Sequence, residues 1–194
     1  MRTFTDKEVF ERGKLVTSLG AKRSVGLPLI VGIQSLADAY DEFDDKFFLY
    51  DENDKFIIGT TGTTNSGATG LKDFMNWNPK GCWVWQTDRF YSGFYEYGLH
   101  KGRMNALRQI KAAYGFRDNN KNDKSEQIGK LYFDNVNANF HGVDYDPNSI
   151  KVIKKIGGWS TACNVCNNMV DYKKIIKFVK PYVYCDYLLL KEWK

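Results

Sequence analysis

Two residues in the last third of the chain have side chains that together could perform thiol chemistry. His141 is one of two histidines in 194 residues, and Cys163, one of four cysteines, follows it by 22 positions among small residues. An imidazole can take the proton of a thiol, and the resulting thiolate is a strong nucleophile. Small neighbours leave the sulfur accessible and leave backbone N–H groups free to hold an oxyanion. The pair therefore predicts a cysteine nucleophile with a histidine base.

The residues around this pair form a pattern of their own. His141-Gly142 is followed, after a loop, by Ser-Thr-Ala-Cys at residues 160–163. This pattern resembles the catalytic signature of the L,D-transpeptidase (YkuD-like) family, in which a His-Gly pair ends a strand and a Ser-x-Gly-Cys turn follows. Ala162 replaces the usual glycine, and Thr161 stands where many members carry a second histidine. Residues 159–165 look more like the divergent branch found in bacteriophage and gut-bacterial proteins.

The resemblance implies a role for each matched residue. Cys163 is the expected nucleophile and His141 the general base, with Ser160 and Gly142 completing the catalytic motif. Backbone N–H groups of residues 161–163 are expected to stabilise the oxyanion. A backbone carbonyl is expected to orient the imidazole, so that no carboxylate is required, although Asp144 lies close in sequence. We expect the sulfur and an imidazole nitrogen within about 4 Å of each other, both facing one cleft.

Three further residues are candidates for substrate binding. Trp159 and Asn164 lie on either side of the turn that carries the cysteine. His100, the second histidine, lies between an aromatic strand and Gly102. It is either a substrate contact or an exposed loop side chain, and the scarcity of histidine favours the functional interpretation.

The predicted function is acyl transfer to Cys163 from peptidoglycan stem peptides, without cofactor or metal. Water as acceptor would make the protein a phage-type wall hydrolase (endolysin), an L,D-carboxypeptidase or endopeptidase; an amine would make it an L,D-transpeptidase. One alternative is a non-enzymatic virion or wall-binding protein with a degraded site. Another is a small zinc module that uses Cys163, Cys166 and a histidine, although the second CxxC of a zinc ribbon is missing. Redox chemistry of this CxxC pair is a further option, and Cys166 is most simply a small buried residue.

The composition predicts one folded domain over residues 1–194. Hydrophobic residues make up 43% of the chain and aromatic residues 15%, which is enough for a core and suits strands. We therefore expect an α+β, β-rich fold. The family resemblance implies an L,D-transpeptidase-like β-sandwich or open barrel with a few short helices.

Charge and hydropathy limit the partners. The net charge is +5, and lysines alternate with Ile and Val at residues 151–155 and 173–180. This pattern favours a solvated face, while a basic face would also suit an anionic polymer such as cell-wall glycan with teichoic acid. No nucleic-acid motif accompanies it, so nucleic acid is not expected as a partner, and the oligomeric state stays open.

The N-terminal sequence lacks the apolar stretch of a signal peptide, and Pro28 and Gly32 interrupt the longest apolar run. We therefore expect synthesis in a cytoplasm and no membrane insertion. Action at the bacterial cell wall would then follow release, with delivery by a separate membrane-permeabilising protein.

Periodicity and turn residues predict the elements that position the site. A capping box at Thr5 and Glu8 predicts a helix over residues 6–19 that ends at Gly20, and a second helix over 171–179 is stopped by Pro181. Residues 61–70, rich in Gly and Thr, are expected to form a loop that is either an exposed connection or part of the substrate site. Strands are expected over residues 29–34, 46–50, 55–60, 82–86, 91–97, 106–113, 130–133, 138–142, 149–156 and 182–190.

Overall fold

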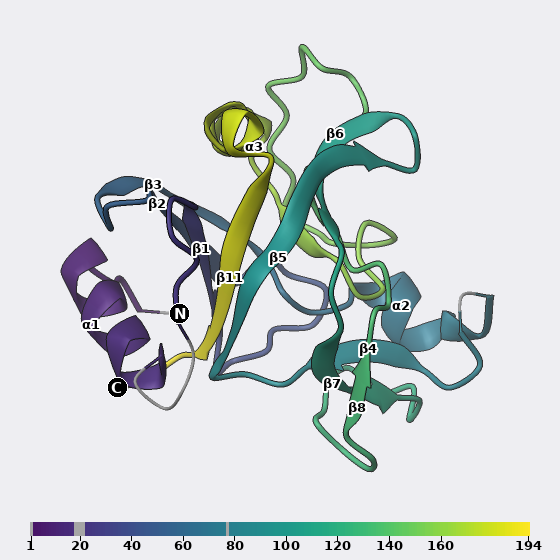
Figure 1. The fold of residues 1–194 in the computed structure, drawn as a ribbon. Coiled ribbons are helices and arrows are strands. Elements are labelled where there is room, and N and C mark those ends of the chain that lie inside the picture. The colour runs from purple at the N-terminus through teal and green to yellow at the C-terminus, as the bar shows by residue number, and fades with distance from the viewer. Residues whose placement is uncertain (1, 18–21, 77) are drawn as a thin grey trace.

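A closed barrel of eight strands forms the centre of the computed structural model, which describes residues 2–17, 22–76 and 78–194 (Figure 1). Around the barrel the strands follow the order β1-β11-β5-β6-β9-β10-β3-β2. Their bounds are Leu29–Gln34 (β1), Asp45–Tyr50 (β2), Phe56–Thr63 (β3), Arg89–His100 (β5), Met104–Gln109 (β6), Phe140–His141 (β9), Asn164–Cys166 (β10) and Tyr184–Lys191 (β11).

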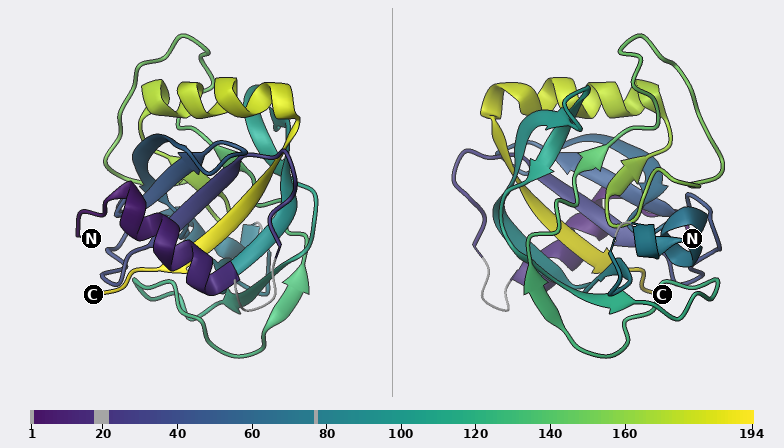
Figure 2. Two further views of the ribbon diagram at one scale, coloured as in Figure 1. Left: turned by 60° about the vertical axis from the view of Figure 1, so that its left-hand side comes forward. Right: turned by 90° about the vertical axis from the view of Figure 1, so that its right-hand side faces the viewer.

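A second, three-stranded sheet and a few short helices surround the barrel. The sheet has the order β4-β7-β8, with bounds Cys82–Trp85, Ala113–Asp118 and Tyr132–Asp134. Figure 2 shows α1 along the outer side of the barrel and α3 across its top. None of the described helices is long and apolar enough to cross a membrane. The helices are α1 (Asp6–Thr17), α2 (Ala68–Lys72) and α3 (Met169–Val179), with 3₁₀ turns η1 (Phe74–Asn76) and η2 (Lys180–Tyr182).

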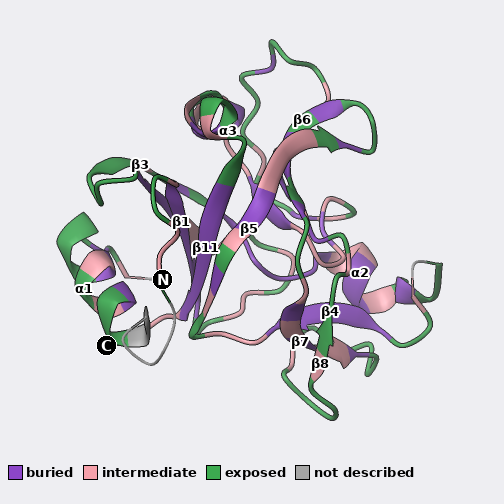
Figure 3. Cartoon of the chain, in the orientation of Figure 1, coloured by how far each residue is buried: buried purple, intermediate pink, exposed green. Residues whose placement is uncertain are grey.

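Strand β1 shows why the core has two parts. Side chains alternate across a strand, so Ile30 points to the main core inside the barrel, while Leu29 and Val31 face outward. The outward residues are nevertheless buried, because Val9 of α1 packs in the same outer cluster. Figure 3 shows the resulting pattern, with β1 and most of β11 buried and much of α1 exposed. A strand covered on both faces is apolar along most of its length, as residues 29–33 are here, and the buried Gln34 at its end donates hydrogen bonds to Thr64 and Asn65.

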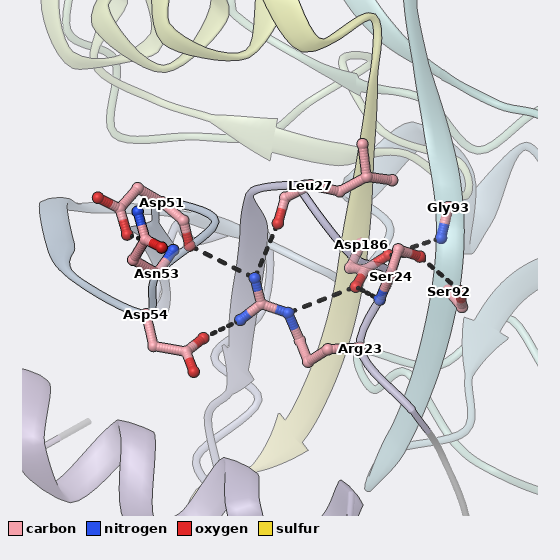
Figure 4. Close-up of polar contacts among 9 residues, drawn as sticks. All are labelled: Arg23, Ser24, Leu27, Asp51, Asn53, Asp54, Ser92, Gly93 and Asp186. Atoms are coloured by element: carbon pink, nitrogen blue, oxygen red, sulfur yellow. Dashed lines mark hydrogen bonds and ion pairs between the residues drawn. The ribbon is translucent and has the colours of Figure 1, made fainter.

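A buried carboxylate ties the segment before β1 to the barrel. Asp186 on β11 is fully buried and accepts hydrogen bonds from Ser24 N (2.8 Å), Ser24 Oγ (2.7 Å) and Gly93 N (2.7 Å). The Arg23 guanidinium lies 3.4 Å from the same carboxylate through Nε and also pairs with Asp54 (Figure 4). Such a charge is stable in the interior only when donors surround it, as they do here.

The prediction of a β-rich fold with a few short helices is confirmed, and the sheet closes into a barrel. The strand over residues 29–34 has the predicted bounds, and α1 begins where the capping box places it. The predicted end of that helix at Gly20 lies outside the described residues. Helix α3 starts two residues early, at Met169, because the Asn168 side chain accepts a hydrogen bond from Val170 N.

Two strand predictions are wrong. The segment 149–156 has the alternating pattern of a strand, but it makes only isolated bridges, Val152 with Asn168 and Lys155 with Glu42. Of its apolar side chains, Ile150 and Val152 are exposed, at 76% and 60%, while Ile156 is buried. The segment 106–113 is divided between β6 and β7 rather than forming one strand. A segment with alternating apolar residues forms a β-strand only when another strand pairs with it, and the local sequence does not show whether such a strand is adjacent.

The Gly/Thr-rich segment 61–70 is also not the predicted loop. It continues β3 to Thr63 and then enters α2 at Ala68. Its hydroxyls bond to the protein interior: Thr64 donates from N (2.6 Å) and Oγ1 (2.7 Å) to the buried carboxylate of Asp45. Because Thr64 is fully buried, it does not line a substrate site.

Candidate functional site

The barrel brings the predicted nucleophile and base together. β9 and β10 are parallel neighbours, with Val165 opposite His141, and they lie beneath α3 in the right-hand view of Figure 2. Cys163 immediately precedes β10, so its side chain is beside the start of β9. One nitrogen of His141, one nitrogen of His100 and Cys163 Sγ all lie within 4.8 Å of one another. The sequence predicted His141 and Cys163 as a pair, and the fold of the barrel places His100 beside them.

The turn that carries the cysteine is held from both sides. Ser160 Oγ donates to Cys163 O at 2.8 Å, which closes the turn on itself. Strand β4 holds the outer carbonyls, with Trp83 N donating to Thr161 O (3.2 Å) and Trp85 Nε1 to Ala162 O (2.9 Å). No described residue accepts a hydrogen bond from the N–H groups of residues 161–163. Ser160 therefore stabilises the turn. The N–H groups of residues 161–163 make no hydrogen bond to a described residue and are available to bind an oxyanion.

His141 has its tautomer fixed by the backbone. Its Nδ1 lies 2.7 Å from Gly142 O, which can only accept, so Nδ1 carries the proton and Nε2 keeps its lone pair. Among the described residues, Nε2 has no hydrogen-bond partner. The imidazole is thus oriented by a backbone carbonyl, while Asp144 binds Ser149 and Lys151 instead. The expectation that the ring faces a cleft is wrong, because His141 is fully buried.

Gly142 is required by packing as well as by its carbonyl. A Cβ at this position would lie 2.6 Å from Met169 Sδ and 2.7 Å from the Tyr172 ring. The absence of a side chain therefore lets α3 approach the strand that holds His141.

His100 is buried rather than exposed on a loop. Its ring stacks on that of His141, with centroids 4.1 Å apart and planes inclined by 25°. Its Nδ1 lies 3.1 Å from Asn139 Nδ2. The Asn139 amide is itself fixed, because its Oδ1 accepts from Gln109 N at 3.1 Å. The assignment of His100 to substrate binding stays a prediction, and its contact in the resting structure is His141.

Burial keeps all three groups of the cluster uncharged. It lowers the pKa of His141 to about 3, helped by the neighbouring His100, and lowers the pKa of His100 to about 4, helped by Lys101. Burial also raises the pKa of the Cys163 thiol to about 11. The sulfur lies 3.9 Å from Asn137 O, which suits a neutral S–H donor. The resting pair is therefore a thiol and a neutral imidazole rather than an ion pair.

The remaining predicted residues divide into two groups. Trp159 is half-buried, with its ring 6.4 Å from that of His141 and 5.7 Å from that of Tyr145. Asn164 is fully buried and donates to Tyr95 Oη at 2.7 Å, so its contact in this structure is within the core, and its assignment to substrate binding stays a prediction. Cys166 is buried in the main core, as its simplest interpretation predicted.

The same cluster could in principle hold a metal, since two imidazoles and a thiolate suit zinc. A metal ligand needs a ring nitrogen with a free lone pair. The Nδ1 lone pair of His100 is taken by the Asn139 amide, and Nε2 then carries the proton. His141 and Cys163 alone are too few ligands for a zinc site, so the residues present do not fit one.

Two cavities lie near the site. One, of about 310 Å³, is lined by Asn137, Thr161 and Ala162, which adjoin Cys163, and by Arg117 among others. The other, of about 530 Å³, runs between α3 and the β5–β6 hairpin, and Met169 and Tyr172 form part of its wall. Its rim carries the basic residues Arg103, Lys173, Lys177 and Lys180.

Sequence reasoning gave no role to Asn139 or to the tryptophans of β4. Asn139 precedes His141 by two positions, and residues spaced by two share a face of a strand. That spacing is the one local signal that could have identified it. No family model, curated protein or solved structure matches the chain.

Proposed function

We propose that this protein is a cysteine-dependent acyl-transfer enzyme that acts on the stem peptides of peptidoglycan. The observation that carries the proposal is the imidazole of His141: its Nε2 has no hydrogen-bond partner among the described residues, and one of its ring nitrogens lies within 4.8 Å of Cys163 Sγ. A buried nitrogen without a partner is costly, and such groups in native proteins commonly have a catalytic reason.

The chemistry follows from these two groups. The sulfur attacks an amide carbonyl as its proton moves to His141 Nε2, and the carbonyl oxygen takes the negative charge. The N–H groups of residues 161–163 stabilise that oxyanion. Collapse breaks the C–N bond, and the proton on Nε2 passes to the leaving amine. Water, deprotonated by the same nitrogen, then releases the acyl group from the thioester.

The substrate class rests on the resemblance of residues 141–142 and 160–163 to the L,D-transpeptidase signature. On the same resemblance, the barrel would be a variant of the L,D-transpeptidase fold. Hydrolysis is the favoured outcome because the motif is closest to the bacteriophage branch. The protein would then act at the cell wall after release from the cell in which it is made. The cavity of about 310 Å³ is lined by Thr161 and Ala162, the two residues that precede Cys163, and would offer space for the peptide.

A second candidate is a non-enzymatic wall-binding protein that keeps the fold. Two observations favour it: His141 is fully buried, and the pKa of the Cys163 thiol is raised to about 11. A buried base and a thiol that stays protonated are both expected in a site that has lost its catalytic activity.

Fragment release separates the two candidates. Purified peptidoglycan is incubated with the wild type and with Cys163→Ala, and the soluble peptides are identified by mass spectrometry. The enzyme proposal expects release by wild type, loss of release in Cys163→Ala and nearly unchanged sedimentation with insoluble wall. Cys185→Ala, which removes a buried thiol on β11, is the matched control and should retain release. No release by wild type, with wall binding intact, would establish the binding protein.

A further inference from the structure

The stacked histidine pair is more specific than a packing contact, because hydrogen bonding gives its members opposite tautomers. Gly142 O can only accept, which places a proton on His141 Nδ1. The Asn139 amide imposes the reverse arrangement on His100. Its Oδ1 faces Gln109 N–H, so the group that faces His100 is the NH₂. An NH₂ can only donate, and His100 Nδ1 must therefore accept.

The consequence is that His100 carries its proton on Nε2. One ring presents a lone pair at Nε2 and the other presents an N–H. Both rings have a nitrogen within 4.8 Å of Cys163 Sγ. Asn139 also joins this arrangement to the turn, since its carbonyl accepts from Asn164 N at 3.0 Å, directly after the cysteine.

We propose that His100 is a second functional imidazole, held by Asn139 as an N–H donor that stabilises negative charge on the sulfur of Cys163. The inference rests on the proposed role of Cys163 as nucleophile and adds a division of labour. His141 Nε2 receives the thiol proton, and His100 keeps its own proton and donates a hydrogen bond to the sulfur anion. Thr161 stands where the resembled signature often has a second histidine, and His100 on β5 would supply that second imidazole instead.

The tautomers can be measured directly, because the chain has only two histidines. Long-range ¹H–¹⁵N correlation spectra of the ¹⁵N-labelled wild type distinguish a protonated from an unprotonated nitrogen in each ring. We expect His141 as the Nδ1–H form and His100 as the Nε2–H form near neutral pH. His100→Gln assigns the signals. Two rings of the same tautomer would overturn the inference, whatever the activity of the protein.

The functional part is tested by the rate at which iodoacetamide alkylates Cys163, with the site identified by peptide mapping. His100→Phe keeps a ring for stacking but has no N–H, and we expect about tenfold slower labelling, the size of a lost charge-assisted hydrogen bond. His100→Gln keeps an amide N–H and should recover most of the rate. Labelling of His100→Phe at the wild-type rate would refute the donor role.

His141→Ala keeps this inference distinct from the proposed function. If His141→Ala labels as fast as wild type, the base assignment fails and the proposed function with it. If His141→Ala slows labelling while His100→Phe does not, the proposed function stands and the role of His100 is overturned.

Discussion

Replacing Gly142 by alanine should both destabilise the protein and disturb the orientation of His141. The new Cβ would lie 2.6 Å from Met169 Sδ and 2.7 Å from the Tyr172 ring, so one side of the contact must move by about 1 Å to reach ordinary van der Waals separation. Overpacking of this kind costs about 1–3 kcal/mol, and the reduced entropy of the unfolded chain returns about 0.4–1 kcal/mol. We expect a net loss of about 1–2 kcal/mol in the free energy of unfolding.

Gly158→Ala is the matched control. A Cβ there would be 3.5 Å from Thr69 Oγ1, which is ordinary contact, so only the entropic gain remains and the variant should be neutral or slightly more stable. Urea unfolding followed by tryptophan fluorescence gives both values. Because the Gly142 carbonyl orients His141, Gly142→Ala should also slow alkylation of Cys163 in the folded protein. Equal stability of the two alanine variants would refute the packing argument.

Three further outcomes are expected. Asp186→Ala should lower the free energy of unfolding in urea by about 3–5 kcal/mol, because it removes the acceptor of three hydrogen bonds and one of the two carboxylates that pair with Arg23. The exposed Ser92→Ala should cost less than about 1 kcal/mol, and a smaller loss in Asp186→Ala than in Ser92→Ala would contradict this. Since the folded pKa values of His141 and His100 (about 3 and 4) lie below the ordinary 6.5, the unfolded state binds more protons between about pH 4 and 6.5, and stability should rise with pH there. His100→Gln should show a smaller rise, and an unchanged slope would exclude this histidine as a cause, because the other titrating groups are common to both proteins. Cys163, half-buried where the other three cysteines are buried, should be alkylated first of the four, and peptide mapping of a partly labelled sample decides this.

The parts of the fold that the sequence predicted well are those in which a local pattern has a local cause. The run at residues 29–33 is apolar because α1 and the barrel interior cover its two faces, and the capping box at Thr5 and Glu8 forms the hydrogen bonds it predicts. The failures depend on distant partners. The alternation in residues 149–156 has no strand to pair with, and Thr64 is buried because Asp45, 19 positions earlier, accepts its hydrogen bonds.

The site divides in the same way. His141 and Cys163 could be paired from the motif, and the parallel pairing of β9 with β10 brings them together across the 22 residues, 142–163, that connect the two strands. The position of His100 could not, since the pairing of β6 with both β5 and β9 is what brings the end of β5 to the end of β9. Asn139 was within reach of sequence reasoning through its spacing from His141, but its effect on a tautomer depends on Gln109 N, which is contributed by another strand.

The uncharged state of the cluster determines which experiment is informative. A neutral thiol and a neutral imidazole react only when the thiol proton passes to His141 Nε2. The negative charge on the sulfur is then opposed by the His141 imidazolium and, in our proposal, by the N–H of His100, and it passes to the carbonyl oxygen as the sulfur attacks. The charge that appears must then be held at the far end of the reacting carbonyl by the N–H groups of residues 161–163. Iodoacetamide offers no such oxyanion, so labelling reports the proton acceptor and the sulfur environment but not the turn. A slow labelling rate is therefore compatible with an active enzyme, and release of stem-peptide fragments is the measurement that decides whether the site turns over.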